Sequence, residues 1–229
     1  MSKPIKIKNK IHNFDKEITV NSDKSLSIRF AILASMANGK SRAFNLSRAD
    51  DIKSTLNCLK KLGVVIKFKK KYCEIVGNGI SSYTYKKNLT LDAGNSGTAA
   101  RLIISTLINS PNEIKITGDQ SLRKRDMKRI IEPLQKFGAT FTKNNGTLPL
   151  YIKGSQNLRS INYKELKGSA QVKSACCLAA LNAPGTTKLK CKPSRNHTEI
   201  MLKYLGVPIK VKKTKKFDHI TINGQKKFK

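Results

Sequence analysis

The sequence predicts a mixed α/β fold in which one structural unit is used three times. Three apolar runs of helical length each begin at a serine-led polar turn, at Ser25, Ser96 and Ser169. These openings lie 71 and 73 residues apart. Each run is followed by a short β-type segment, a more polar helix that ends in an apolar residue and a glycine, and a further strand. Because self-similarity at a nearly fixed spacing indicates a repeat, it outweighs any single motif.

The first unit opens at the polar turn that ends at Ser25. The apolar run from Leu26 to Met36 predicts a buried helix, because its residues are apolar on every face. The elements predicted after it are a strand at 44–46, a helix at 52–62 capped by residues 47–51, and a hairpin of 64–68 with 72–76.

The second and third units repeat this order. The second has predicted strands at 89–91, 114–117, 139–141, 148–152 and 158–163, an apolar helix at 102–108, and a polar helix ending at Phe137 and Gly138. The third has a predicted apolar helix at 172–181, strands at 187–190, 207–209 and 217–223, and a helix that is capped at 194–199 and ends at Leu205 and Gly206.

Each serine-led opening has the features of an anion site. Gly94 and Gly97 allow a tight turn before the second helix, whose free N–H groups and positive dipole end favour a phosphate or carboxylate. Lys24 precedes the first helix, and Arg29 lies one turn inside it. Taken singly, each opening is equally well interpreted as a capped helix without a ligand. Three equivalent helix starts, however, could converge on one anionic ligand.

The chain of 229 residues is long enough for one large domain or two small ones. It has 46 Lys and Arg against 14 Asp and Glu, a formal charge of +32. This charge is compatible with nucleic-acid binding, with a site for acidic small molecules, or with a generally lysine-rich proteome. The lysines are spread over many segments, and no basic motif interleaved with aromatic residues is present, which favours lysine-rich solvated surfaces.

The number of cysteines, five, is odd, and the sequence has no CxxC pair. We therefore expect reduced thiols and a cytoplasmic protein. The three histidines are far apart and have no metal-ligand spacing, so neither a metal nor another cofactor is expected. The N-terminus alternates lysine with apolar residues and does not have the pattern of a signal peptide. No apolar run approaches the length of a membrane span.

Five motifs in the same order resemble EPSP synthase, the 3-phosphoshikimate 1-carboxyvinyltransferase of the shikimate pathway. They are Lys24-Ser25-Leu26-Ser27-x-Arg29, Gly94-Asn95-Ser96-Gly97-Thr98, Gly118-Asp119-x-Ser121-Leu122-x-x-Arg125, Ser169-Ala170-Gln171-Val172-Lys173-Ser174 and Ser194-Arg195-x-His197-Thr198-Glu199. The chain departs from the family pattern at Ile28, where His or Asn is usual, at Asp126, where Pro is usual, and at Asn196, where Asp is usual.

The resemblance implies an α/β (α+β) fold with three βαβαββ repeats, which form one domain of the inside-out α/β barrel of enolpyruvyl transferases. Residues 1–20 are then a strand segment expected to associate with a missing C-terminal domain. Residues 21–229 are the N-terminal enolpyruvyl transferase domain, with repeats at about 21–90, 91–165 and 166–229.

The activity implied by the resemblance is transfer of the enolpyruvyl group from phosphoenolpyruvate to the 5-hydroxyl of shikimate 3-phosphate, which gives EPSP and phosphate. The implied shikimate 3-phosphate ligands are Lys24, Ser25, Arg29, Ser169, Ala170, Gln171 and Arg195. The implied phosphoenolpyruvate ligands are Lys24, Asn95, Gly97, Arg125 and Gln171. The family is also inhibited by glyphosate at the phosphoenolpyruvate site.

No catalytic residue is assigned, because the resemblance places the acid/base carboxylates in the missing half. This chain alone is therefore expected to be inactive. The implied partners are the two substrates and a C-terminal enolpyruvyl transferase domain, in the same or another chain. No specific nucleic acid and no membrane are expected as partners, and the complete enzyme is expected to be a monomer.

Two alternatives remain open from the sequence. One is the related enzyme that transfers enolpyruvyl to UDP-N-acetylglucosamine, which typically has a reactive cysteine in the loop aligned with Gly118 to Arg125. This loop contains no cysteine. The other is a basic nucleic-acid-binding protein, whose binding would weaken steeply with salt and show no sequence preference.

Overall fold

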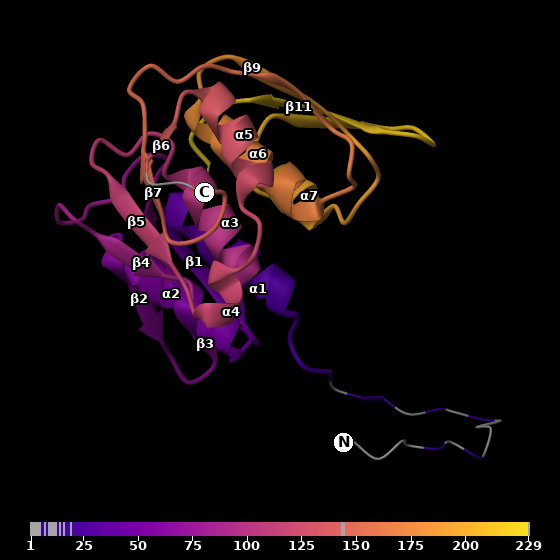
Figure 1. Ribbon diagram of the computed structural model, residues 1–229. Coiled ribbons are helices and arrows are strands. Elements are labelled where there is room, and N and C mark those ends of the chain that lie inside the picture. Colours follow the sequence, from indigo (N-terminus) through magenta and orange to yellow (C-terminus); the bar gives the residue numbers. More distant parts are fainter. Residues whose placement is uncertain are drawn as a thin grey trace.

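The computed structural model describes residues 20–142 and 145–228, together with residues 6, 8, 13, 15, 17 and 18. Its helices and three sheets are shown in Figure 1. The helices are α1 (Lys24–Met36), α2 (Asp50–Lys61), α3 (Gly97–Thr106), α4 (Gln120–Arg123), α5 (Lys128–Phe137), α6 (Ala170–Asn182) and α7 (His197–Tyr204). The strands are β1 (Asn38–Phe44), β2 (Val65–Phe68), β3 (Tyr72–Asn78), β4 (Thr90–Asp92), β5 (Ile114–Thr117), β6 (Thr140–Thr142), β7 (Leu150–Lys153), β8 (Asn162–Glu165), β9 (Thr186–Cys191), β10 (Ile209–Lys213) and β11 (Asp218–Asn223).

The three sheets repeat one topology, which confirms the predicted fold class. The strand orders are β4-β5-β7-β6 in the second unit and β8-β9-β11-β10 in the third. In both, the first pair is parallel and the remaining pairs are antiparallel. The first unit has the order β1-β3-β2, with antiparallel pairs only. Among the described residues, it therefore lacks the strand that corresponds to β4 and β8.

Several predicted boundaries need correction. The predicted strand at 44–46 is wrong: β1 ends at Phe44, and Asn45 has a φ of 56° that leaves the extended conformation. Antiparallel pairing with β3, rather than local β propensity, places this strand earlier in the chain. The predicted strand at 158–163 is displaced to β8, which pairs with β9 in the third sheet. β8 therefore belongs structurally to the third unit, although the predicted repeat boundary of 165/166 assigned it to the second.

The first helix of each unit lies in the interior, as its apolar sequence predicts. α1, α3 and α6 are buried along most of their length. α2 and α5 instead have one buried face, and this amphipathic pattern is typical of helices that cover a core. All three inner helices contribute to one continuous hydrophobic core, which includes Ile28, Ile103 and Leu178.

Three glycines at equivalent places allow each sheet to approach the end of its inner helix. A Cβ atom on Gly77 would lie 2.2 Å from the Ala34 carbonyl oxygen. A Cβ on Gly154 would lie 2.6 Å from the Ile108 carbonyl oxygen, and one on Gly224 would lie 1.9 Å from that of Ala183. Because backbone atoms cannot yield as a flexible side chain can, these positions require glycine.

The predicted N-terminal strand segment, residues 1–20, lies mostly outside the described residues. The described ones belong to no helix or strand, and the side chains of Ile18 and Val20 are 65% and 69% exposed. Within the part of the chain that the structure describes, no helix combines the length and apolarity that a membrane crossing needs.

Candidate functional site

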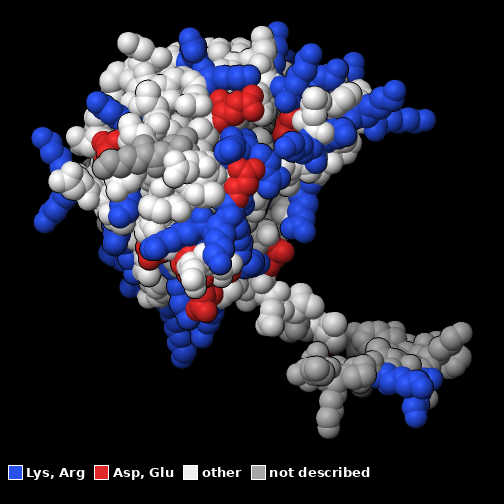
Figure 2. Space-filling model, in the orientation of Figure 1, with Lys and Arg blue, Asp and Glu red and all other residues white. Residues whose placement is uncertain are grey.

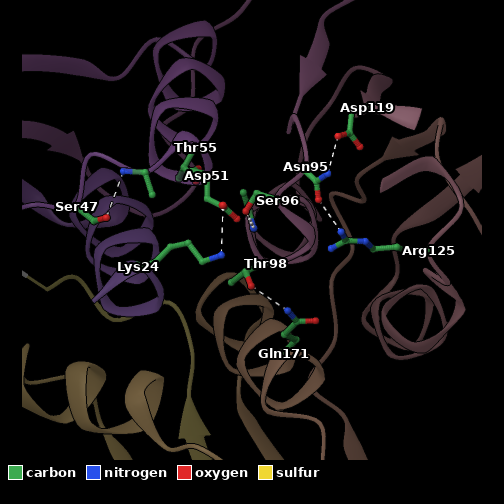
Figure 3. A network of polar contacts seen from close by, with 12 residues as sticks. Lys24, Ser47, Asp51, Thr55, Asn95, Ser96, Thr98, Asp119, Arg125 and Gln171 are labelled. Atoms are coloured by element: carbon green, nitrogen blue, oxygen red, sulfur yellow. Dashed lines mark hydrogen bonds and ion pairs between the residues drawn. The ribbon is translucent and has the colours of Figure 1, made fainter. Parts of the chain in front are cut away.

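The N-terminal ends of α1, α3 and α6 meet on one face of the domain, as the repeat of serine-led openings suggests (Figure 3). The Gln171 side chain at the start of α6 donates a 2.9 Å hydrogen bond to the hydroxyl of Thr98 at the start of α3. Arg29 of α1 donates a 3.1 Å hydrogen bond to the Ser174 hydroxyl on α6. The free N–H groups and positive dipole ends of three helices are therefore gathered in one region.

The predicted serine caps are confirmed for two of the three helices. The side chain of Ser96 accepts a hydrogen bond from Ala99 N, and that of Ser169 accepts one from Val172 N. The expectation that Ser25 caps the first helix is wrong. Asp23 is the N-cap, and its carboxylate accepts a 2.6 Å bond from Leu26 N. A carboxylate at the N-cap position, which accepts from the N–H three residues later, caps a helix as well as a hydroxyl does.

Ser25 lies in the first turn of α1, half-buried, and its carbonyl accepts a hydrogen bond from Arg29. Lys24 begins α1, and its Nζ lies 3.3 Å from a carboxylate oxygen of Asp51 in the first turn of α2. The Lys24 side chain is about half exposed and points across the helix starts in Figure 3. Because exposed ion pairs are weak, an incoming phosphate can compete with Asp51 for this ammonium group.

Arg29 is buried and held by three protein groups. Its Nε donates to the Thr198 hydroxyl at 2.9 Å, and its two terminal nitrogens donate to the Ser25 carbonyl and the Ser174 hydroxyl. Burial lowers the pKa of Arg29, partly offset by the charge of Glu199. The guanidinium therefore joins α1, α6 and α7, and it brings a positive charge beneath the helix starts.

Gly97 is the first residue of α3, and the side chains of two arginines lie close to it. A Cβ atom here would lie 2.9 Å from Nη1 of Arg101 and 3.2 Å from Nη1 of Arg125. Arg125 is exposed, and it donates a 2.6 Å hydrogen bond to the side-chain oxygen of Asn95. The Asn95 amide in turn donates to Asp119, the residue that caps α4. The absent side chain at Gly97 thus lets two guanidinium groups approach the turn.

Arg101 is a residue of this region that the sequence motifs do not identify. This buried arginine on α3 donates a 2.7 Å hydrogen bond to the Gln171 side chain and a 2.8 Å bond to the Asp126 carbonyl. Burial lowers its pKa, and the neighbouring charges of Arg129 and Arg125 lower it further. A charged residue at the head of an apolar helix was the signal available, because burying an arginine costs free energy unless it is paired.

Asp126, where the sequence departs from the family, does not form an ion pair with Arg125 in the structure. Its carboxylate accepts a 2.7 Å hydrogen bond from Lys128 N at the start of α5 and lies 3.6 Å from Arg129. The acidic side chain therefore stabilises the start of a helix. The other departure near the site, Ile28, is fully buried in the core.

A second buried cation lies beneath α6 and α7. Lys173 is 0% exposed, and its Nζ lies 2.8 Å from Glu199, 3.6 Å from Asp218 and 3.3 Å from the Ser194 carbonyl. Ser194 directly precedes Arg195, which is exposed at the surface. Lys173 thus connects the helix that begins at Ala170 with the loop that carries Arg195. In the sequence, Lys173 is recognisable only as a member of the motif from Ser169 to Ser174.

His197 is the first residue of α7, and its N-cap residue Asn196 makes no side-chain cap hydrogen bond. The Nδ1 atom of His197 is buried, with no hydrogen-bond partner among the described groups. The five cysteines are all buried and free. Burial raises the pKa of Cys58 and of Cys191 to about 12, so neither thiol is available as a nucleophile at neutral pH.

The described residues contain no cluster of three or more metal-ligating side chains. Lys and Arg lie at many places on the visible face in Figure 2, with a smaller number of Asp and Glu among them. This distribution resembles a lysine-rich solvated surface more than a single basic patch.

The chain is similar to EPSP synthases over nearly its whole length. The family model for EPSP synthase (3-phosphoshikimate 1-carboxyvinyltransferase) matches residues 8–229. A 3-phosphoshikimate 1-carboxyvinyltransferase from Ruthia magnifica subsp. Calyptogena magnifica is 45% identical over 200 residues, which covers 86% of this chain and 46% of that relative. One from Caldicellulosiruptor saccharolyticus is 42% identical over 196 residues, covering 84% and 45%.

Among solved structures, EPSP synthase from Acinetobacter baumannii superposes with a TM-score of 0.83 at 36% identity, covering 92% of this chain and 47% of that one. The chain therefore spans about half the length of the relatives that it matches.

Proposed function

Since this chain belongs to the EPSP synthase family, we propose that it carries the N-terminal half of the site that transfers enolpyruvyl from phosphoenolpyruvate to shikimate 3-phosphate. The products are EPSP and phosphate. The observation that carries this proposal is the meeting of three helix starts with the cations Lys24, Arg29, Arg101 and Arg125. Both substrates are anions, and such groups offset their charge in a closed site.

We propose that Lys24, Ser25 and Arg29 of the first unit bind shikimate 3-phosphate together with Ser169, Ala170, Gln171 and Arg195 of the third. Lys24 has the most direct support, because it is partly exposed at a helix start and its partner Asp51 is a weak competitor. Arg29 has three donors already engaged, so it would act mainly through its charge and through the position of Ser25.

Phosphoenolpyruvate is proposed to bind next to the second helix start, through Lys24, Asn95, Gly97, Arg125 and Gln171. The exposed guanidinium of Arg125 is fixed by Asn95, and Gly97 leaves the space in front of it open. A planar guanidinium fits a carboxylate or phosphate with two parallel hydrogen bonds.

Catalysis is proposed to need a C-terminal enolpyruvyl transferase domain that closes over this face. The residues assigned here bind and position anions, and none of them is placed as the acid/base group that moves a proton. A second domain would supply those carboxylates and exclude water from the site. The complete enzyme is proposed to be a monomer that acts in the cytoplasm, where five unpaired thiols stay reduced.

The UDP-N-acetylglucosamine alternative is disfavoured because the loop from Gly118 to Arg125 has no cysteine and the thiols elsewhere are buried. The nucleic-acid alternative is disfavoured because the chain belongs to the EPSP synthase family, and because Lys and Arg are spread over the face that Figure 2 shows.

The experiment is a calorimetric titration of the purified chain with shikimate 3-phosphate at low and high salt. We expect saturable 1:1 binding that weakens with salt, because half of a cleft leaves the bound anion screened by ions. Lys216→Met is the matched control: this exposed lysine lies between β10 and β11, so its loss should leave binding unchanged. Absence of saturable binding, or equal binding of unrelated phosphate monoesters, would contradict the proposal.

A further inference from the structure

A buried ammonium group next to the candidate site has three partners. Lys173 of α6 is 0% exposed, and its Nζ atom lies 2.8 Å from Glu199, 3.3 Å from the Ser194 carbonyl and 3.6 Å from Asp218. An ammonium group has three N–H donors, so each can be directed at one of these partners. Because Lys173 is fully enclosed, it cannot touch a substrate and can affect the site only through the groups around it.

Stability alone does not explain a lysine at this position. Moving an ammonium group and two carboxylates out of water costs free energy that their attraction only partly returns, and apolar residues of similar volume are often equally stabilising. The neighbouring residues of α6, from Val172 to Leu181, are buried and mostly apolar. An apolar residue could not, however, hold a backbone carbonyl in place with a hydrogen bond. The contact with the Ser194 carbonyl is therefore what a lysine adds here.

The Ser194 carbonyl belongs to the loop that carries Arg195. Among the described residues, Lys173 makes the one hydrogen bond from a side chain to the backbone of residues 193–196. The Ser194 hydroxyl is buried without a hydrogen-bond partner in the described part of the chain, and Asn196 makes no side-chain cap for α7. The loop is therefore fixed between its two ends by Lys173.

The start of α7, which follows this loop, is bonded to both inner helices of the site. The Thr198 hydroxyl accepts a 2.9 Å hydrogen bond from Arg29 of α1 and donates a 2.8 Å bond to Ser174 of α6. Burial is the main cause that lowers the pKa of Arg29, Glu199 raises it, and the charge of Arg195 lowers it further. The charges of Arg195 and Arg29 therefore act in one region, which a single anion can share.

We propose that Lys173 is a positioning residue for shikimate 3-phosphate, because its hydrogen bond to the Ser194 carbonyl holds the loop so that Arg195 and the start of α6 face the same anion. This inference rests on the proposed function, which assigns Arg195 and Ser169 to that ligand. Lys173 can join the two because it lies in the first turn of α6, whose N-cap is Ser169. Its two carboxylate partners balance the ammonium charge.

The test compares Lys173→Met/Glu199→Gln with Glu199→Gln alone, in the enzyme assembled with its C-terminal half. The paired change removes one charge of each sign, so it avoids leaving the Glu199 carboxylate buried without its closest cation. Glu199→Gln alone keeps the hydrogen bond between Lys173 and the Ser194 carbonyl. Ile152→Ala, a core substitution in β7 of the second sheet, is the control for a general loss of stability.

We expect KM for shikimate 3-phosphate to rise about 10-fold in the paired variant relative to Glu199→Gln, and KM for phosphoenolpyruvate to change less than about 2-fold. Ile152→Ala should reduce the amount of folded enzyme and leave both KM values unchanged, because a purely structural defect does not weaken one substrate selectively. An unchanged KM for shikimate 3-phosphate, or an equal rise in both constants, would overturn the proposal.

Trypsin cleavage after Arg195, measured by mass spectrometry on this chain alone, examines the loop without any substrate. Cleavage should be at least about 10-fold faster in the paired variant than in Ile152→Ala, because the loop opens locally as well as through global unfolding. Equal cleavage rates would overturn the claim that Lys173 holds the loop.

Arg195→Ala distinguishes failure of this inference from failure of the proposed function. If Arg195→Ala alone leaves KM for shikimate 3-phosphate unchanged, the assignment of Arg195 to that ligand is wrong, whatever the trypsin result. If Arg195→Ala raises KM, we expect no further rise when it is combined with the paired variant, since Lys173 acts through Arg195. Additive effects on KM would overturn the positioning role and leave the proposed function intact.

Discussion

Arg101 on α3 donates a 2.7 Å hydrogen bond to the side-chain oxygen of Gln171 at the start of α6, and the Gln171 amide donates to Thr98 at 2.9 Å. Two of the three helix starts are thereby joined through one glutamine. The orientation of its amide is fixed, because its oxygen faces the guanidinium and its nitrogen faces the hydroxyl. Arg101 is a positioning residue in this account, since it acts through Gln171.

Arg101→Lys should weaken phosphoenolpyruvate binding without unfolding the domain. Lysine keeps the charge but carries all its donors on one nitrogen, whereas Arg101 reaches Gln171 and the Asp126 carbonyl with two different nitrogens. In an enzyme assembled with its C-terminal half, we expect KM for phosphoenolpyruvate to rise about 10-fold, which corresponds to about 1.4 kcal/mol. In the double variant with Gln171→Ala, the two effects should not add, because each single change already removes the same hydrogen bond between residues 101 and 171. Simple additivity would argue against the positioning role.

Gly97→Ala should affect glyphosate more than phosphoenolpyruvate. The added methyl would lie 2.9 Å from Arg101 and 3.2 Å from Arg125, so it displaces both guanidinium groups and narrows the space before them. The longer ligand loses more contacts in the narrowed space. The measurement compares the inhibition constant of glyphosate with KM for phosphoenolpyruvate in the assembled enzyme. Equal increases in both constants would contradict this placement of Gly97.

In the enzyme assembled with its C-terminal half, Lys24→Met should reduce shikimate 3-phosphate affinity at least ~30-fold while leaving the fold intact. Losing one partner of a desolvated charge pair costs roughly 2–5 kcal/mol. The stability should change little, since the side chain is about half exposed and its ion pair with Asp51 is a surface one. Calorimetry measures the affinity, and thermal unfolding serves as the control. An unchanged dissociation constant would remove Lys24 from the site.

Lys173→Met should be among the most destabilising single changes in the chain. It removes the buried ammonium and leaves the carboxylates of Glu199 and Asp218 uncompensated, at a cost of about 3–5 kcal/mol. Lys173→Met with Glu199→Gln should be less destabilising than the sum of the two single changes. The free energy of unfolding from urea titrations provides the comparison. A loss below about 1 kcal/mol for Lys173→Met in that titration would contradict the prediction, because it would mean that water or another cation compensates the two carboxylates.

The sequence predicted most of the features that rest on local patterns. Ser96 and Ser169 were identified as helix starts because a hydroxyl before an apolar run is a local signal. Gly138 was correctly placed after its helix, and its φ of 118° explains the need for glycine. The same local signal wrongly predicted Ser25 as the cap of the first helix, because Asp23, two residues earlier, provides the stronger acceptor.

What the sequence did not predict depends on contacts between distant residues. Arg101 and Gln171 are 70 residues apart, and Arg29 and Thr198 are 169 apart, so no local pattern reports either pair. The start of β1 at Asn38 is similarly set by pairing with β3, because its own residues include no β-branched side chain. Repeat spacing located the three helix starts, but only packing shows which side chains join them.

The most direct test of the central claim is a phosphate-release assay with both substrates present. It compares this chain alone, the chain mixed with the C-terminal domain from the same organism, and the same mixture with Lys24→Met. We predict no detectable release by the chain alone, release by the mixture, and strongly reduced release with the variant, because one half binds anions and the other completes the acid/base machinery. Turnover by this chain alone at ordinary enzyme rates would contradict that division of labour.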